Sequence, residues 1–136
     1  MAINRALEEA FARCAIDRNR LAIGGFSDGA SYALSLGLAN GDVFGYVIAF
    51  SPGFIVRLTR VEDLATTTKS KFRGCIAHGT ADNVLPIAST SRVFVSSLRK
   101  NGYDVEYREF SGGHHVSRQV AEQAMTWLAA AFHQRG

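Results

Sequence analysis

Apolar residues in this chain occur in two patterns that alternate from the N-terminus onward. The first pattern is helical: apolar residues recur every three or four positions and predict a helix over about residues 2–15, through Ile3, Leu7, Phe11 and Cys14. The polar segment DRNR ends this helix. The second pattern is a short continuous apolar run, LAIGG from Leu21, which is typical of a buried strand.

Two later runs repeat the second pattern and predict further strands at Val43–Phe50 and Phe72–Gly79. The segment DVEYREF, Asp104–Phe110, is predicted to be a fourth strand. The stretch Phe54–Ser70 fits neither pattern. It holds either a short helix around Val61–Thr66 or only a loop, and the sequence leaves both open.

Three further helices follow the first, third and fourth of these strands. One follows Ser27 and stops at the Asn-Gly pair beginning at Asn40, with a shared apolar face formed by Ala30, Leu34 and Leu38. Pro86 suits the first position of the next helix, which runs to about Lys100. The last helix spans about Val116–Phe132 and turns its apolar side inward through Val120, Ala124, Trp127, Leu128 and Ala131.

Strands that alternate with helices predict the α/β class, in which a parallel sheet is covered on both faces. We therefore expect a parallel sheet of about four strands with helices on both faces. The length of 136 residues suits a single domain, residues 1–136, that buries a real core.

Composition and charge exclude several classes of partner. Hydrophobic residues make up 47% of the chain and charged residues 20%, which is ordinary for a globular protein. The net charge of +3 is spread along the sequence, so no nucleic-acid partner is predicted. No apolar run approaches the length of a membrane span and no signal peptide is visible, so no membrane association is predicted.

The two cysteines, Cys14 and Cys75, lie far apart and form neither a disulfide framework nor a CxxC metal motif. Cys75 falls within a predicted strand and is expected to be a small buried apolar residue. We expect no metal, and a reducing, cytoplasmic location.

One glycine-rich segment, GGFSDGA, stands between a predicted strand and a predicted helix. Residues Gly25 to Gly29 fit the pattern G-x-S-x-G around Ser27. Glycine lowers stability in regular structure, so both glycines should serve a backbone purpose. In this motif the serine sits on a sharp strand-to-helix turn that exposes its hydroxyl.

Chemically suited residues follow the other strands in a meaningful order. Asp82 comes after the third predicted strand and His114 and His115 come after the fourth. Loops after parallel strands meet at one edge of the sheet, and Ser, Asp, His is the chain order of α/β-hydrolases. A histidine activates the serine and an aspartate orients the histidine. The backbone N–H of Asp28, at a helix start, is the candidate oxyanion donor.

Each candidate also has a purely structural interpretation. Ser27 is a suitable helix N-cap, and Asp82 is suitably placed to cap the helix near Pro86. His114 follows two glycines and suits a turn. The coincidence of three residue types in the order of a known triad favours the catalytic interpretation.

Three segments together resemble the carboxylesterase/phospholipase-like branch of the α/β-hydrolase superfamily: IDRNRLAIGGFSDGA, HGTADNVLP and SGGHHVSRQVAEQAMTWL. The resemblance covers almost the whole chain and is weakest over Phe54–Ser70. It implies that Ser27 is the nucleophile, Asp82 the acid and His114, which follows the paired glycines, the base. The family more often has glutamine where this chain has Asp28, which adds a negative charge beside the site.

The resemblance also implies a shortened α/β-hydrolase core. Family members carry further strands before the nucleophile strand, and one of their loops supplies a second oxyanion N–H. The chain is thus similar to the C-terminal half to two-thirds of a member, either as a truncated product or as a minimal enzyme that completes its site in another way. The strand from Leu21 would then be a sheet edge, and exposed edges favour association, so a homodimer or higher oligomer through that edge is predicted.

The predicted function is a serine hydrolase that cleaves small carboxylic esters, with short acyl chains, through an acyl-enzyme and without a cofactor. Phe26, Phe54 and Leu85, with Ile55 and Val56, are candidates for an acyl-binding surface, although apolar residues after strands also serve as ordinary core. The alternative is a non-catalytic or weakly active remnant that acts as an interaction module or needs a partner chain. A nucleotide-binding protein is disfavoured because GGFSDG matches neither phosphate-binding glycine motif.

Overall fold

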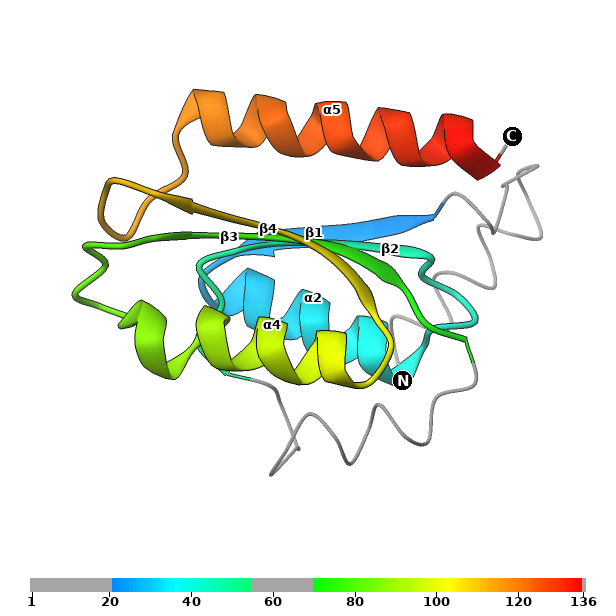
Figure 1. The fold of residues 1–136 in the computed structure, drawn as a ribbon, viewed down its shortest axis with the longest axis horizontal. Helices are drawn as coiled ribbons and strands as arrows, with labels where there is room; N and C mark the ends of the chain where they lie inside the picture. The colour runs from blue at the N-terminus through cyan, green and yellow to red at the C-terminus, as the bar shows by residue number, and fades with distance from the viewer. Residues whose placement is uncertain (1–20, 55–69, 136) are drawn as a thin grey trace.

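The computed structural model describes residues 21–54 and 70–135, and these residues form a layered α/β fold (Figure 1). The predicted helix over residues 2–15 and the possible helix at Val61–Thr66 lie outside the described residues. The elements follow in the order β1 (Ala22–Phe26), α2 (Asp28–Ala39), β2 (Tyr46–Phe50), β3 (Arg73–Gly79), η2 (Ile87–Ser89), α4 (Ser91–Lys100), β4 (Asp104–Phe110) and α5 (Arg118–Arg135).

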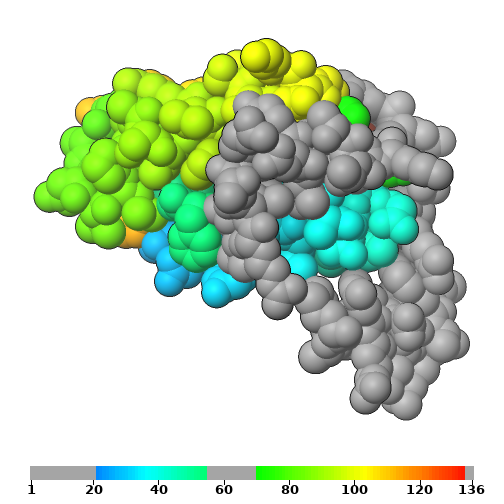
Figure 2. All heavy atoms as spheres, turned by 90° about the horizontal axis from the view of Figure 1, so that it is seen from below, coloured from blue at the N-terminus to red at the C-terminus, as the bar shows by residue number. Residues whose placement is uncertain are grey.

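The strands form one parallel sheet in the order β1-β2-β3-β4. Helix α5 lies on one face of the sheet, and α2 and α4 lie on the other (Figure 1). Figure 2 views the second face directly, with α4 in yellow-green along one side and α2 in cyan along the other. The predicted fold class, a parallel sheet of about four strands with helices on both faces, is confirmed.

Two apolar layers hold the helices to the sheet. The predicted inner face of α2 is fully buried at Ala30, Leu34 and Leu38, and it packs in one cluster with Val47 and Ile76 of the central strands. On the other side, Ile48 and Ala124 form a second cluster, against which residues of α5 pack. The predicted inward side of α5 is thus confirmed. Val120, Ala124 and Ala131 are buried, and Trp127 and Leu128 pack against the second cluster.

Cys75 is a member of this second cluster and is 1% exposed, as predicted. Its thiol is free. Burial raises the pKa of the thiol to about 11, so it is an uncharged apolar group at neutral pH.

The predicted element boundaries need correction at several points. The second strand begins at Tyr46 rather than Val43, because the N–H groups of Val43 and Phe44 donate to the Asn40 carbonyl and form a turn. The ends of the first strand, the third strand and the last helix shift by one to three residues. These elements span Ala22–Phe26, Arg73–Gly79 and Arg118–Arg135.

The helix expected from Pro86 is also divided into two parts. A 3₁₀ turn, η2, follows Pro86, and α4 begins only at Ser91. Thr90 between them has φ −125° and ψ −100°, which is not helical, and its hydroxyl donates to the Pro86 carbonyl. The proline therefore begins a tight turn rather than the helix itself.

Strand β1 pairs only with β2 among the described residues, so it forms an edge of the described sheet. It is not the buried strand that its apolar sequence predicts, because all of its residues are partly or fully exposed and Phe26 is 40% exposed. The homodimer through this edge stays a prediction. Within the described ranges, no helix has the length and apolarity that crossing a membrane requires.

Candidate active site

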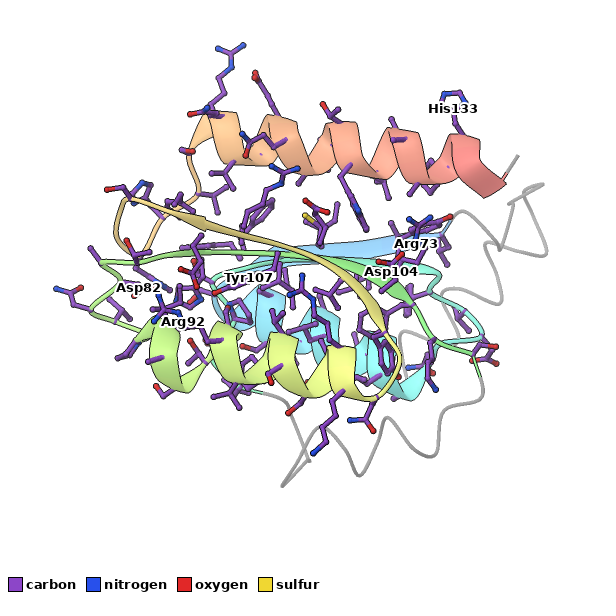
Figure 3. The ribbon with its side chains drawn as sticks, in the orientation of Figure 1. Arg73, Asp82, Arg92, Asp104, Tyr107 and His133 are labelled. Atoms are coloured by element: carbon purple, nitrogen blue, oxygen red, sulfur yellow. The ribbon has the colours of Figure 1, made fainter. Side chains whose placement is uncertain are left out.

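The predicted site residues meet at the carboxyl end of the sheet. Ser27 directly follows β1, Asp82 follows β3, and His114 follows β4. Figure 3 shows Asp82 beyond the end of β3. Parallel strands bring these loops, which lie far apart in the sequence, to one place.

The turn between β1 and α2 is sharp and strained at Ser27. Ser27 has φ 57° and ψ −117°, a conformation that non-glycine residues rarely adopt. Its N–H still donates to the Phe50 carbonyl at 2.9 Å, so β1 continues to pair with β2 up to the turn. The turn lifts the hydroxyl away from the sheet edge, as the G-x-S-x-G pattern predicts.

The two glycines of the motif differ in what the backbone demands of them. A Cβ on Gly25 would lie 2.4 Å from the carbonyl carbon of Gly29, because the first turn of α2 packs directly on this residue. A Cβ on Gly29 would meet nothing within 4 Å. The expectation of a backbone purpose is confirmed for Gly25, whereas no steric demand is present at Gly29.

The Ser27 hydroxyl does not cap α2. Its side chain makes no capping hydrogen bond, and Oγ lies instead 2.9 Å from Nε2 of His114. Nδ1 of the same ring lies 2.7 Å from Oδ2 of Asp82. A carboxylate only accepts, so Nδ1 carries the proton, and the neutral ring accepts the Ser27 O–H at Nε2.

The Asp82 carboxylate is buried, with 5% of the residue exposed, and its two oxygens have different hydrogen-bond partners. Oδ1 accepts the N–H groups of Val84 and Leu85 at 2.9 and 2.8 Å, which fixes the loop after β3. Oδ2 faces His114. Burial alone would raise the pKa of Asp82, but the hydrogen bonds from Leu85, His114 and Val84 outweigh it and lower the pKa below its usual value. The carboxylate is therefore ionised at neutral pH.

Asp28 is the first residue of α2. The first N–H groups of a helix have no partner within the helix, so the backbone N–H of Asp28 belongs to a set of donors suited to an anion. The side chain of Asp28 is exposed. Only the backbone of this residue is relevant to the predicted oxyanion role.

The apolar candidates differ in their exposure and in their contacts. The ring of Phe26 is 4.9 Å from the His114 ring, and Phe26 is 40% exposed. Phe54 is also 40% exposed and makes an edge contact with Tyr32. Leu85 is partly buried and closely approaches Gly53, where a Cβ would lie 2.8 Å from its methyl groups. Ile55 and Val56 lie outside the described residues.

His115 is exposed and its ring contacts Phe110 edge-on, 5.7 Å away. This agrees with the choice of His114 as the base. The histidine loop packs tightly on β3, because a Cβ on Gly79 would lie 2.3 Å from the Gly112 carbonyl oxygen. Gly79 thus allows the acid and histidine loops to approach each other.

Two further residues contribute to the site that the sequence did not single out. Ser31, fully buried one turn into α2, accepts the N–H groups of Gly53 and Phe54 at 2.9 and 3.1 Å and donates to the Ser27 carbonyl at 3.2 Å. It therefore ties the loop after β2 to the nucleophile turn. His78, fully buried in β3, lies against Asp82. The feature of the sequence that could have identified Ser31 is its position one helical turn after the candidate nucleophile.

Among residues 21–54 and 70–135, no three His, Cys, Asp or Glu side chains gather as metal ligands would. The described site consists of a hydroxyl, an imidazole and a carboxylate in hydrogen-bonded sequence. Such an arrangement is suited to nucleophilic attack on a carbonyl carbon.

The parallel sheet, the strained serine turn and the loop order Ser-Asp-His define an α/β-hydrolase fold. Comparison with protein families shows that the phospholipase/carboxylesterase model matches residues 2–131. The chain belongs to this family. No curated protein sequence gives a significant match.

Solved structures agree with this assignment. Esterase PE8 is 26% identical with a TM-score of 0.79, and the match covers 94% of this chain and 58% of that protein. The carboxylesterase of Bacillus cereus is 25% identical with a TM-score of 0.75, covering 95% of this chain and 58% of its own. The acyl-protein thioesterase 2 of Zea mays, at 23% identity and a TM-score of 0.59, shares the fold over 79% of this chain and 54% of its own. The chain therefore spans less than two thirds of these relatives.

Proposed function

We propose that this protein hydrolyses carboxylic esters through a Ser27-His114-Asp82 triad. One observation carries the proposal: an unbroken hydrogen-bonded path of 2.9 Å from Ser27 Oγ to His114 Nε2 and 2.7 Å from His114 Nδ1 to Asp82 Oδ2. Family membership supports ester hydrolysis in general, because solved relatives include carboxylesterases.

Acylation begins when Ser27 Oγ attacks the ester carbonyl carbon and His114 Nε2 takes the hydroxyl proton. The C–O bond to the alcohol then breaks, and the proton on Nε2 goes to the leaving oxygen. In the second half, His114 takes a proton from water, whose oxygen attacks the acyl carbon. The acid leaves, and Nε2 returns the proton to Ser27 Oγ. Asp82, ionised at neutral pH, stabilises the imidazolium in both halves.

The negative charge on the tetrahedral oxygen needs a hydrogen-bond donor. The N–H of Asp28 at the start of α2 is our proposal for that donor, supported by its position directly after the nucleophile. Phe26 beside His114, with Phe54 and Leu85, is proposed to contact the acyl group. We propose short acyl chains as the preferred substrates.

The test is hydrolysis of p-nitrophenyl acetate and butyrate by the purified protein and by Ser27→Ala. We expect the substitution to lower kcat by up to about 10⁶-fold, the scale seen when a serine nucleophile is removed. Ser96→Ala, which removes an exposed hydroxyl from α4, is the matched control and should retain parental activity. A fluorophosphonate probe should label the parent but not Ser27→Ala.

Equal turnover by the parent and Ser27→Ala would refute the proposal. If the parent neither hydrolyses the esters nor accepts the probe, the chain does not assemble a working triad, and the non-catalytic alternative gains support. Rates that rise from acetate to octanoate would refute the short-chain part of the proposal alone.

A further inference from the structure

A second histidine lies behind the acid of the proposed triad. His78 occupies the penultimate position of β3 and is fully buried. Its Nε2 is 2.7 Å from the Leu85 carbonyl oxygen and 3.2 Å from Oδ2 of Asp82, the same oxygen that faces His114. Its Nδ1 is 2.6 Å from Oγ of Ser91, which is fully buried at the start of α4.

These contacts fix the tautomer of His78. The Leu85 carbonyl and the Asp82 carboxylate are both acceptors, so the nitrogen between them, Nε2, must carry the proton. In the neutral ring, Nδ1 then accepts the hydrogen of the Ser91 hydroxyl. His78 and His114 therefore approach one carboxylate oxygen through opposite ring nitrogens.

The loop from Asp82 to Leu85 is held at both of its ends by this arrangement. The Leu85 N–H donates to Asp82 Oδ1, and the Leu85 carbonyl accepts from His78. His78 also contacts Asp82 directly, so it links the backbone and the carboxylate of the same loop. An ordinary core histidine would be satisfied by Leu85 and Ser91 alone, whereas here Nε2 also lies 3.2 Å from Oδ2 of the proposed catalytic acid.

We propose that His78 is a positioning residue for the reaction. It holds the Asp82–Leu85 loop so that Oδ2 meets His114 Nδ1 at hydrogen-bond distance, while the Ser91 hydroxyl donates to Nδ1 of His78. The inference rests on the proposed triad. It predicts that loss of the Nε2 donor acts on the chemical step and leaves substrate binding unchanged.

Two isosteric substitutions separate the two ring nitrogens. His78→Gln places an amide N–H close to the position of Nε2, whereas His78→Asn reaches only the position of Nδ1. We expect His78→Asn to lower kcat about 100-fold with KM within twofold, since small misplacement of a catalytic group has effects of this size. His78→Gln should recover most of that loss.

His133→Asn is the matched control, because His133 is exposed on α5 at the end of the molecule opposite Asp82 (Figure 3). Parental kcat in a folded His78→Asn variant would overturn the inference. So would a Gln variant no better than Asn, or a change confined to KM.

A second measurement is independent of turnover. The ¹⁵N spectrum of the parent should show His78 protonated at Nε2 and His114 at Nδ1, with a far-downfield ring proton on His114. If the parent lacks esterase activity, the proposed function fails on its own. The inference on His78 is then decided by the His114 ring proton, which should vanish in His78→Asn and persist in His78→Gln. An Nδ1 proton on His78, or a His114 signal unchanged in His78→Asn, would overturn it.

Discussion

The two ends of the sheet differ in which residue types adopt a positive φ. At the carboxyl end, the residues with positive φ are serines: Ser27 at 57° after β1 and Ser51 at 53° after β2. At the amino end, the residue with positive φ that precedes β4 is a glycine, Gly102 at 87°. Glycine adopts this conformation without steric cost, whereas each serine costs on the order of 1–3 kcal/mol.

Several buried side chains that carry polar groups also lie near the carboxyl end. His78, Asp82, Ser31 and Ser51 are buried near the carboxyl end, and Oγ of Ser51 has no hydrogen-bond partner among the described residues. The amino end has the buried tyrosines Tyr46 and Tyr103 and an exposed ion pair between Arg73 and Asp104 (Figure 3). Strain and buried polar groups persist only where the surrounding structure holds them and where function benefits. The two serines with positive φ therefore support the carboxyl end as the place of the proposed site.

Among the substitutions that compare the two ends of the sheet, Asp82→Asn should have the largest effect on activity. An amide in place of the carboxylate no longer stabilises an imidazolium on His114 and favours the wrong tautomer, so kcat should fall by on the order of 10⁴-fold. Asp42→Asn, an exposed substitution in the turn that leads toward the amino end of β2, should leave kcat unchanged. Ester hydrolysis by both variants checks this, and a loss of less than tenfold in Asp82→Asn would contradict it.

The same variant gives a pH prediction with a definite sign. The pKa of Asp82 is lower in the folded protein than its ordinary value of 3.8. The ionised carboxylate therefore stabilises the native state above that pH, and this contribution is lost as the pH falls through the lower, folded value. The difference in unfolding free energy between parent and Asp82→Asn should be larger at pH 6 than at pH 3. Urea unfolding measures it, and a difference independent of pH would count against the hydrogen-bonded carboxylate.

Gly25→Ala tests how tightly the strained turn at Ser27 is packed. We expect a large loss of stability, although the free-energy change is smaller than the one predicted for catalysis in Asp82→Asn. The new Cβ would approach the backbone of Gly29 to 2.4 Å, so β1 or α2 must move, at a cost of about 3 kcal/mol. Gly29→Ala is the matched control in the same motif, where a Cβ meets nothing within 4 Å. Thermal unfolding of both variants provides the measurement. Equal destabilisation of the two would show that the turn is not constrained by the packing of Gly25.

Much of this end of the molecule was predictable from the sequence because it depends on local patterns. Apolar runs located the strands, and the loops after parallel strands gather at one edge whatever their lengths. The positions of Ser27, Asp82 and His114 follow from these rules and from the family resemblance. The buried face of α2 likewise follows from helical periodicity.

Other features depend on tertiary contacts that no local pattern encodes. Whether His78 reaches Asp82 depends on side-chain rotamers and on the path of the loop, since β3 could carry a histidine in many environments. Val43 was assigned to a strand by its apolar character, but the Asn40 carbonyl captures its N–H in a turn. The apolar sequence of β1 also predicts burial, whereas exposure depends on which elements cover it.

The smallest effects should come from two exposed ion pairs, one at each end of the sheet. Glu109, in the last part of β4, accepts two hydrogen bonds from Arg92 at 2.8 and 3.0 Å and one from the Tyr107 hydroxyl at 2.8 Å. The Arg92 and Tyr107 hydrogen bonds lower the pKa of Glu109 to about 2. Asp104, at the start of β4, accepts a hydrogen bond from Nε of Arg73 at 3.0 Å.

Glu109→Gln should therefore destabilise the protein by about 1 kcal/mol and Asp104→Asn by about 0.3 kcal/mol, within the usual range for exposed pairs. The larger value follows from bidentate geometry, which fixes Arg92 and loses two charge-assisted bonds at once. Both differences should shrink in 1 M salt, which screens exposed charges. Urea unfolding at low and high salt measures them, and kcat should be unchanged in Asp104→Asn. A larger loss of stability in Asp104→Asn than in Glu109→Gln would contradict this prediction. It would mean that polar side chains at the carboxyl end are not held more firmly than those at the amino end.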